Sequence, residues 1–377
     1  MSVPAVPRVV SGCTVCQHLV SIVTSATSSG DVVLDVADLT VEFRTDEGRV
    51  QAVRGVSFQL HRGEVLGIVG ESGSGKSVTS LAAMGLLPGS AQVSGSVRFS
   101  GRSGGSSGST ELLGASDSEL SRVRGQGIAM IFQDPMTSLN PVYTVGYQIA
   151  EAIRAHQDVT RDAAGKQAVE LLDVVSIPNP AERARSYPHE LSGGMRQRVV
   201  IAIAMANHPE VIIADEPTTA LDVTVQAQIM EALHTAKVET GAAMLLITHD
   251  LGVIAGQADR VQVMYAGKVV EVGTVEEIFY APRMPYTLGL LGSLPRLDVA
   301  TERLYPISGA PPSLINMSPG CPFAARCPLA AAICEAEEPP LAWSGTPGHL
   351  SACHFSDKLD GVEPGDLFHP ISRDIES

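Results

Sequence analysis

Residues 70–77 combine glycine, lysine and serine in a spacing that suits phosphate binding. Glycines let backbone N–H groups turn toward a phosphate, a lysine reaches its oxygens, and a serine hydroxyl can ligate Mg²⁺. An apolar run at residues 65–69 precedes the motif and a helical pattern at residues 76–87 follows it, which is the context that such a loop requires. The sequence therefore predicts a nucleotide-binding loop that consists of Gly70, Ser72, Gly73, Ser74, Gly75, Lys76 and Ser77.

A second apolar run, residues 211–214, ends in two adjacent carboxylates, Asp215 and Glu216. Because successive residues of a strand point to opposite sides, the two acids should have different roles. Asp215 is placed to hold Mg²⁺, and Glu216 is placed to polarise a water molecule that attacks the terminal phosphate. An acidic turn after a core strand is the alternative, and the presence of the phosphate loop favours the catalytic interpretation.

A serine and two glycines, Ser192, Gly193 and Gly194, open a predicted helix and offer free N–H groups to an anion. Capped glycine turns are common, so this signal is weak when taken alone. Together with the phosphate loop and the two carboxylates, however, it resembles the signature of ATP-binding cassette (ABC) proteins. The resemblance covers about residues 32–273.

This resemblance implies roles for further residues. Phe43 matches the aromatic residue that stacks on adenine, although a place in a strand core explains it equally well. Gln133 matches the glutamine that senses Mg²⁺ and the attacking water, and His249 matches the histidine that contacts the γ-phosphate. Asp222 lies in a segment that resembles the loop that reaches across a dimer of cassettes. In such a dimer, ATP lies between the phosphate loop of one cassette and residues 192–194 of the other.

The order of apolar segments predicts an α/β fold. Strand-like runs alternate with helical stretches after residue 127, which indicates a parallel sheet with helices packed on it, and the first runs indicate an antiparallel subdomain. By resemblance this is the P-loop NTPase fold of ABC type, with a mixed sheet core, an antiparallel β subdomain, a helical subdomain and a small C-terminal cysteine-containing module. The predicted strands are residues 32–36, 39–43, 50–60, 65–69, 128–132, 211–214 and 243–248.

Composition shifts divide the chain into three predicted parts. Residues 1–30 have little periodicity, and we interpret them as a disordered or mis-started extension. Residues 31–273 form the cassette, with a flexible Gly and Ser insertion at residues 100–117 and the helical subdomain at about 134–205. Residues 274–377, rich in proline and glycine, form the C-terminal module.

Four cysteines lie near one another in the C-terminal sequence, with the spacing C-x5-C-x6-C-x18-C. Four thiolates can hold an iron–sulfur cluster or a tetrahedral Zn²⁺ ion, and unligated thiols are a third interpretation. The absence of paired C-x2-C units makes zinc the weaker choice. Another pair, Cys13 and Cys16, lies in the N-terminal extension and is interpreted as incidental. The four C-terminal cysteines are Cys321, Cys327, Cys334 and Cys353.

Several segments further resemble the ATPase subunits of oligopeptide and dipeptide importers: residues 133–141, 187–190, 195–198 and 285–287, with Met284 where we expect histidine. The resemblance includes the cysteine pattern, so it implies a 4Fe-4S cluster in addition to ATP and Mg²⁺. It also implies two transmembrane permease subunits, a second ABC ATPase subunit and an extracytoplasmic peptide-binding protein. For the second ATPase subunit, a paralogue is favoured over a second copy of this chain. The chain would then lie peripherally on the cytoplasmic face of the inner membrane.

Composition restricts the alternatives. The 377 residues carry 26 basic and 41 acidic side chains, a formal net charge of -15, and no basic patch that would attract a nucleic acid. No apolar stretch approaches the roughly 18 residues that a membrane-spanning helix needs, so any membrane role requires partner chains.

Three other functions compete with peptide import. A nickel, glutathione or other small-solute importer remains open. A soluble ABC ATPase that acts on nucleic acid or ribosomes is disfavoured by the acidic charge, and the 113 residues between Ser77 and Leu191 leave no space for a long coiled coil. A regulatory module without turnover would be expected to lack Glu216 or His249, and both are present.

Overall fold

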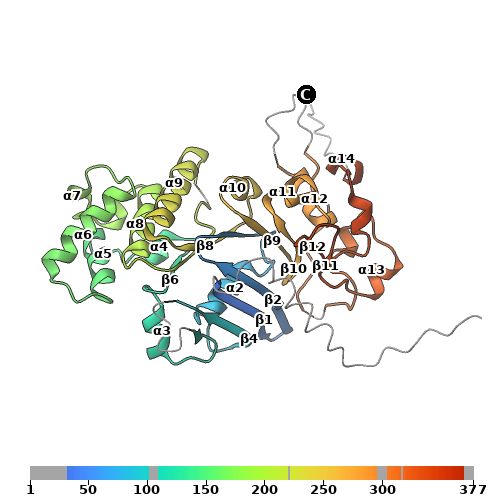
Figure 1. The fold of residues 1–377 in the computed structure, drawn as a ribbon, viewed down its shortest axis with the longest axis horizontal. Coiled ribbons are helices and arrows are strands. Elements are labelled where there is room, and N and C mark those ends of the chain that lie inside the picture. The colour runs from blue at the N-terminus through green and yellow to red at the C-terminus, as the bar shows by residue number, and fades with distance from the viewer. Residues whose placement is uncertain (1–31, 102–108, 220, 295–303, 316, 369–377) are drawn as a thin grey trace, which may run out of the picture.

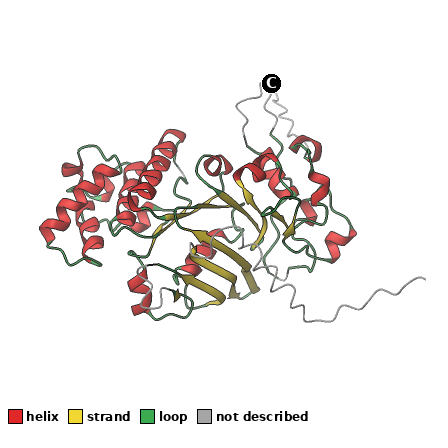
Figure 2. Ribbon diagram, in the orientation of Figure 1, coloured by secondary structure: helices red, strands yellow, loops and turns green. Residues whose placement is uncertain are grey.

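The computed structural model describes residues 32–101, 109–219, 221–294, 304–315 and 317–368. The predicted extension at residues 1–30 lies outside this range. Two sheets form the centre of the molecule, with a group of helices at one end and the C-terminal segment at the other (Figures 1 and 2). No helix in the described part of the chain is both long enough and apolar enough to span a bilayer.

The smaller sheet is antiparallel, as the sequence predicts, and its strand order is β2-β1-β4-β5. The predicted strands 32–36 and 39–43 are one strand, β1 (Val32–Thr45), because a shift in register accommodates Asp38, whose φ is 48°, without ending the pairing. At the other edge, β5 (Thr110–Glu111) pairs with β4 (Ala91–Phe99). This end of the predicted flexible insertion is therefore part of the fold. The remaining strand is β2 (Gly48–His61).

The larger sheet has the order β11-β12-β10-β9-β3-β8-β7-β6. Its strands from β9 to β6 pair in parallel, which confirms the predicted parallel core. Every residue of β3, β7 and β8 is buried, as expected for strands covered on both faces. Because parallel strands end at one edge, the residues that follow β3, β6, β7 and β8 are brought together. The parallel strands are β3 (Val65–Val69), β6 (Ile128–Ile131), β7 (Val211–Asp215), β8 (Ala243–Thr248) and β9 (Arg260–Tyr265).

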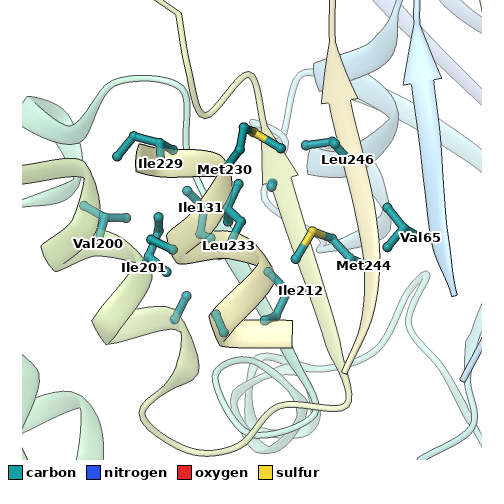
Figure 3. Close-up of a cluster of buried hydrophobic side chains, with 14 of the residues drawn as sticks. Val65, Ile131, Val200, Ile201, Ile212, Ile229, Met230, Leu233, Met244 and Leu246 are labelled. Atoms are coloured by element: carbon teal, nitrogen blue, oxygen red, sulfur yellow. The ribbon is translucent and has the colours of Figure 1, made fainter. Parts of the chain in front are cut away.

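Helices cover the larger sheet. On one face lie α8 (Gly193–Met205) and α9 (Val223–Thr240), whose apolar side chains meet those of β6, β7 and β8 (Figure 3). The opposite face packs on α2 (Lys76–Ala83) and on the antiparallel sheet. Helix α2 ends at Ala83 and is therefore shorter than the predicted helix at residues 76–87. The other helices of the cassette are α3 (Asp117–Val123), α4 (Pro135–Ser138), α5 (Val145–Arg154), α6 (Arg161–Val174), α7 (Pro180–Arg183), the 3-10 helix η1 (Pro188–Glu190) and α10 (Leu251–Ala255).

The C-terminal segment, residues 274–377, is joined to the cassette through the larger sheet. β12 (Leu350–Ser351) pairs with β10 (Lys268–Thr274), and β11 (Ala342–Trp343) pairs with β12. Phe323 and Leu359 belong to the main hydrophobic core, so this segment is continuous with the cassette. Its helices are α11 (Val275–Tyr280), α12 (Pro285–Gly292), η2 (Ala324–Arg326), α13 (Ala332–Ala336), η3 (Ser356–Leu359) and α14 (Pro364–Leu367).

Candidate functional site

The predicted phosphate loop connects β3 to α2 and wraps around the ammonium group of Lys76. Lys76 is buried, and its Nζ atom donates hydrogen bonds to the carbonyl oxygens of Gly70 (2.8 Å) and Glu71 (3.0 Å). A Cβ atom at Gly70 would lie 2.2 Å from the Met264 carbonyl oxygen, so a glycine is required there. Burial lowers the pKa of the Lys76 ammonium from its usual value, although nearby carboxylates oppose this effect.

Two of the three predicted Mg²⁺-binding residues are in contact. The Ser77 hydroxyl donates a hydrogen bond to Oδ1 of Asp215 at 2.9 Å. Burial raises the pKa of the Asp215 carboxyl to about 6, an effect that the hydrogen bond from Ser77 opposes. A hydroxyl and a carboxylate are ligands that Mg²⁺ prefers, so this pair fits the ion. The third predicted residue, Gln133, donates a hydrogen bond to Glu216, and in the described part of the chain it forms none with Ser77 or Asp215.

Glu216 is the point at which the three predicted catalytic residues meet. Its Oε2 atom lies 3.0 Å from Nε2 of Gln133 and 3.3 Å from Nδ1 of His249. The other oxygen, Oε1, lies 3.9 Å from Nζ of Lys76. The carboxylate of Glu216 thus meets Lys76, Gln133 and His249. These residues come after β3, β6 and β8, respectively.

The backbone of Glu216 is held in an uncommon conformation. Its φ is 46°, in the left-handed region, and its N–H donates a hydrogen bond to the Ile247 carbonyl oxygen at 2.8 Å. The Thr219 hydroxyl also donates to Oε2 of Glu216, at 2.8 Å. Thr219 was not among the predicted site residues; its place three residues after the acid, in a turn that contains Pro217, was the available signal.

The predicted signature residues are not joined to the phosphate loop by any hydrogen bond within the described structure. Ser192 caps α8 by accepting a hydrogen bond from the N–H of Met195. Ser192 and Gly193 are exposed, whereas Gly194 is buried against Val225 of α9. Asp222 is also exposed, and it caps α9.

Phe43 lies near the end of β1, partly buried against the apolar residues of the antiparallel sheet. A ring that is partly packed and partly exposed is consistent with either predicted role. Its stacking on adenine therefore remains a prediction.

All four predicted cysteines line one small cavity and carry free thiols. Burial raises the pKa of Cys327 to about 12 and that of Cys353 to about 11. Among the described residues, no three His, Cys, Asp or Glu side chains are grouped closely enough to hold a metal ion.

Comparison with known proteins gives the family. One family model, the ABC transporter, matches residues 53–219, and a second, the oligopeptide/dipeptide transporter C-terminal region, matches residues 270–334. The dipeptide transport ATP-binding protein DppD of Bacillus subtilis is 54% identical over 305 residues, 80% of this chain and 89% of the relative. The chain belongs to the ABC transporter family.

Two further members of this ABC transporter family are close in sequence. The oligopeptide transport ATP-binding protein OppD of Escherichia coli is 49% identical over 328 residues, 87% of this chain and 94% of the relative. OppD of Mycobacterium tuberculosis is 57% identical over 337 residues, 89% of this chain, which spans only 54% of that longer relative.

Solved structures support the ABC fold. A dimeric post-hydrolysis state of the ATP-binding cassette MJ0796 bound to ADP and Pi superimposes with a TM-score of 0.55 at 27% sequence identity, over 64% of this chain and 98% of that one. The structure of cbiO1 from Clostridium perfringens, part of the ABC transporter complex cbiONQ, gives a TM-score of 0.54 at 28% identity, over 67% and 92% of the two chains.

Proposed function

We propose that this chain is the ATP-hydrolysing subunit of a bacterial importer of dipeptides or oligopeptides. The observation that carries the catalytic part is the convergence of Gln133, His249 and Lys76 on the carboxylate of Glu216. Glu216 would accept a proton from the attacking water, Gln133 would orient that water, and His249 would contact the γ-phosphate. Ser77 and Asp215 would hold the Mg²⁺ ion, which neutralises phosphate charge when bound.

A second cassette completes the site in this proposal. Ser192, Gly193 and Asp222 are exposed, and the helix start at Ser192 offers N–H groups that suit a phosphate. The ATP-binding cassette MJ0796, which shares the fold, is a dimer in its post-hydrolysis state with ADP and Pi. We infer that Ser192, Gly193 and Gly194 contact ATP held by the partner cassette, a paralogue in preference to a second copy.

An exposed aromatic surface supports docking to permease subunits. We define it by Met136, Val142, Tyr143, Tyr147 and Tyr187, each at least 40% exposed. The rings of Tyr143 and Tyr147 stack at 4.9 Å, and a hydrogen bond from the Val145 N–H to the Ser186 carbonyl, at 3.0 Å, joins the two segments that carry the surface. Exposed apolar groups gathered in this way are typical of protein interfaces. Permeases bound here would hold the chain on the cytoplasmic face of the inner membrane and would receive peptide from an extracytoplasmic binding protein.

For the cysteines we propose a 4Fe-4S cluster. All four thiols face one cavity, and the C-terminal family model covers three of them. Iron and sulfide in anaerobically purified protein would support the cluster, whereas stoichiometric zinc without iron would contradict it.

Co-purification from detergent-solubilised membranes tests the importer proposal. We expect two permeases and a second ABC subunit to accompany the tagged chain, and uptake of labelled peptide to require Glu216. Recovery of ribosomal proteins without a permease would favour the soluble ABC alternative. Uptake of nickel or glutathione instead of peptide would show that the chain serves a small-solute importer.

A further inference from the structure

Glu71, the second residue of the phosphate loop, is held by two residues of the C-terminal segment. The guanidinium of Arg326 makes a bidentate ion pair with its carboxylate, with Nη1 to Oε2 at 2.7 Å and Nη2 to Oε1 at 2.8 Å. The hydroxyl oxygen of Tyr286 accepts a hydrogen bond from the Glu71 N–H at 2.8 Å. The Glu71 carbonyl oxygen in turn accepts the hydrogen bond from Lys76.

The side chain of Arg326 is itself fixed in place. It is 5% exposed, against 26% for Glu71, and its guanidinium carbon lies 5.9 Å from the ring centres of both Tyr265 and Phe323. The rings of Tyr265, Tyr286 and Phe323 pack on one another with centroids 4.5 to 5.5 Å apart. Because the aromatic rings fix the plane of the guanidinium, its paired N–H donors point in one direction. The position of the Glu71 carboxylate that accepts both hydrogen bonds is therefore fixed as well.

The same arginine belongs to the cysteine region. Arg326 ends the short helix η2 and directly precedes Cys327, while Cys321 lies three residues before the start of that helix. Phe323, which is fully buried, lies between these cysteines and also lines the cavity that they share. The two cysteines and the guanidinium are therefore linked by one short segment and one buried ring.

Charge gives this contact a direct bearing on nucleotide binding. An unpaired carboxylate on the phosphate loop would repel a triphosphate, and Arg326 neutralises that charge. We propose that Arg326 and Tyr286 are positioning residues that hold the phosphate loop through Glu71, and that this contact couples ATP binding to the four-cysteine segment. Thermodynamic linkage makes this coupling reciprocal. If a conformational change in the cysteine segment weakens ATP binding, bound ATP makes that conformational change less favourable by the same free energy. The inference rests on ATP being the nucleotide bound, as proposed above.

ATP affinity measured in a Glu216→Gln background, where turnover is removed, tests the positioning role. We expect Arg326→Met to weaken ATP binding about tenfold and Tyr286→Phe, which keeps the ring, to weaken it about threefold. Arg326→Lys should recover only part of the loss, because an ammonium lacks the fork. The double variant Glu71→Gln, Arg326→Met should also recover part of the lost ATP affinity, because it removes the unpaired negative charge of Glu71.

Lys268→Met is the matched control, since Lys268 also ties the cassette to the C-terminal segment, through Glu338 at 2.7 Å, without touching Glu71. Its ATP affinity should change less than about twofold. If Arg326→Met and Tyr286→Phe bind ATP like the unaltered chain, the positioning role is refuted while the proposed ATPase function stands. If the unaltered chain does not bind ATP, the proposed function fails and the inference fails with it.

Hydrogen exchange tests the coupling by a readout other than activity. Saturating ATP should slow exchange of the backbone amides at residues 321–328 in the Glu216→Gln protein and in its Lys268→Met derivative. In the Arg326→Met derivative, at an ATP concentration raised to restore saturation, this protection should be lost. Equal protection in all three proteins would overturn the coupling.

Discussion

The carboxylate of Glu216 accepts a hydrogen bond at 3.0 Å from the amide of Gln133, which lies 83 positions earlier in the chain. Gln133 follows β6 and Glu216 follows β7, and these strands are parallel neighbours. The pairing holds together a group that can orient water and a group that can accept its proton. The contact is therefore a product of the sheet, since nothing local in the sequence joins the two residues.

Glu216→Gln removes the proposed general base and keeps the shape of the side chain. We expect ATP hydrolysis to fall by at least about 100-fold, while ATP affinity stays within a few-fold of the unaltered chain. Steady-state hydrolysis and equilibrium nucleotide binding measure the two effects. Glu231→Gln, an exposed acid on α9, is the control and should hydrolyse ATP normally. Undiminished hydrolysis in Glu216→Gln would exclude this role for Glu216.

The two signature glycines should respond differently to alanine. A Cβ atom at Gly194 would lie 2.5 Å from Cγ1 of Val225, whose branched side chain has little freedom in a helix, whereas a Cβ at Gly193 would make an ordinary contact at 3.5 Å with Leu221. We expect Gly194→Ala to lower the free energy of unfolding by about 1 to 3 kcal/mol. Gly193→Ala should leave stability unchanged or slightly raised and should reduce ATP hydrolysis through the proposed contact with a second cassette.

Denaturant unfolding and ATPase assays separate the two outcomes. A loss of stability in Gly193→Ala equal to that in Gly194→Ala would mean that both glycines serve only the packing of α8. Normal hydrolysis by a stable Gly193→Ala protein would argue against its proposed contact with ATP.

The proximity of the phosphate loop, Asp215 and Glu216 was predictable, because each follows an apolar strand and parallel strands end at one edge. The roles of Gln133 and His249 come from the resemblance to ABC proteins, and the assigned roles of all these residues stay predictions. Arg326 was not predictable in the same way, since 255 positions separate it from Glu71 and no periodic pattern links them. The pairing of β12 with β10 was also missed, because β12 has only two residues and carries no strand signal of its own. Short strands and long-range ion pairs depend on tertiary packing, which local patterns do not record.

A buried hydrogen-bonded pair joins β10 to the C-terminal segment. Nε2 of His349 lies 2.8 Å from Oε1 of Glu271, and the two side chains are 2% and 0% exposed. His349→Ala would leave a buried carboxylate without this partner, and we expect the free energy of unfolding to fall by about 3 kcal/mol. Denaturant unfolding measures the change. His234→Ala, at an exposed position on α9, should change stability by less than about 0.5 kcal/mol, and equal effects of the two substitutions would show that the buried pair makes no special contribution.

The aromatic surface should be required for assembly and dispensable for the fold. Tyr143 is 46% exposed and its ring stacks on Tyr147, so its removal costs few internal contacts. We expect Tyr143→Ser to reduce recovery of permeases with the tagged chain by about tenfold, because aromatic side chains dominate binding at such interfaces. ATP binding and the unfolding midpoint of the isolated chain should stay unchanged.

Tyr280→Ser is the matched control for this surface. Tyr280 is 85% exposed on α11, a helix that lies apart from α4 and α5 (Figure 1), so its loss tests whether any exposed tyrosine affects recovery. Permease recovery should be normal in this variant. If both substitutions reduce recovery equally, the effect is not specific to the aromatic surface. If neither substitution reduces recovery, the permeases dock elsewhere. The groove between the two sheets and the C-terminal segment is then the next surface to alter.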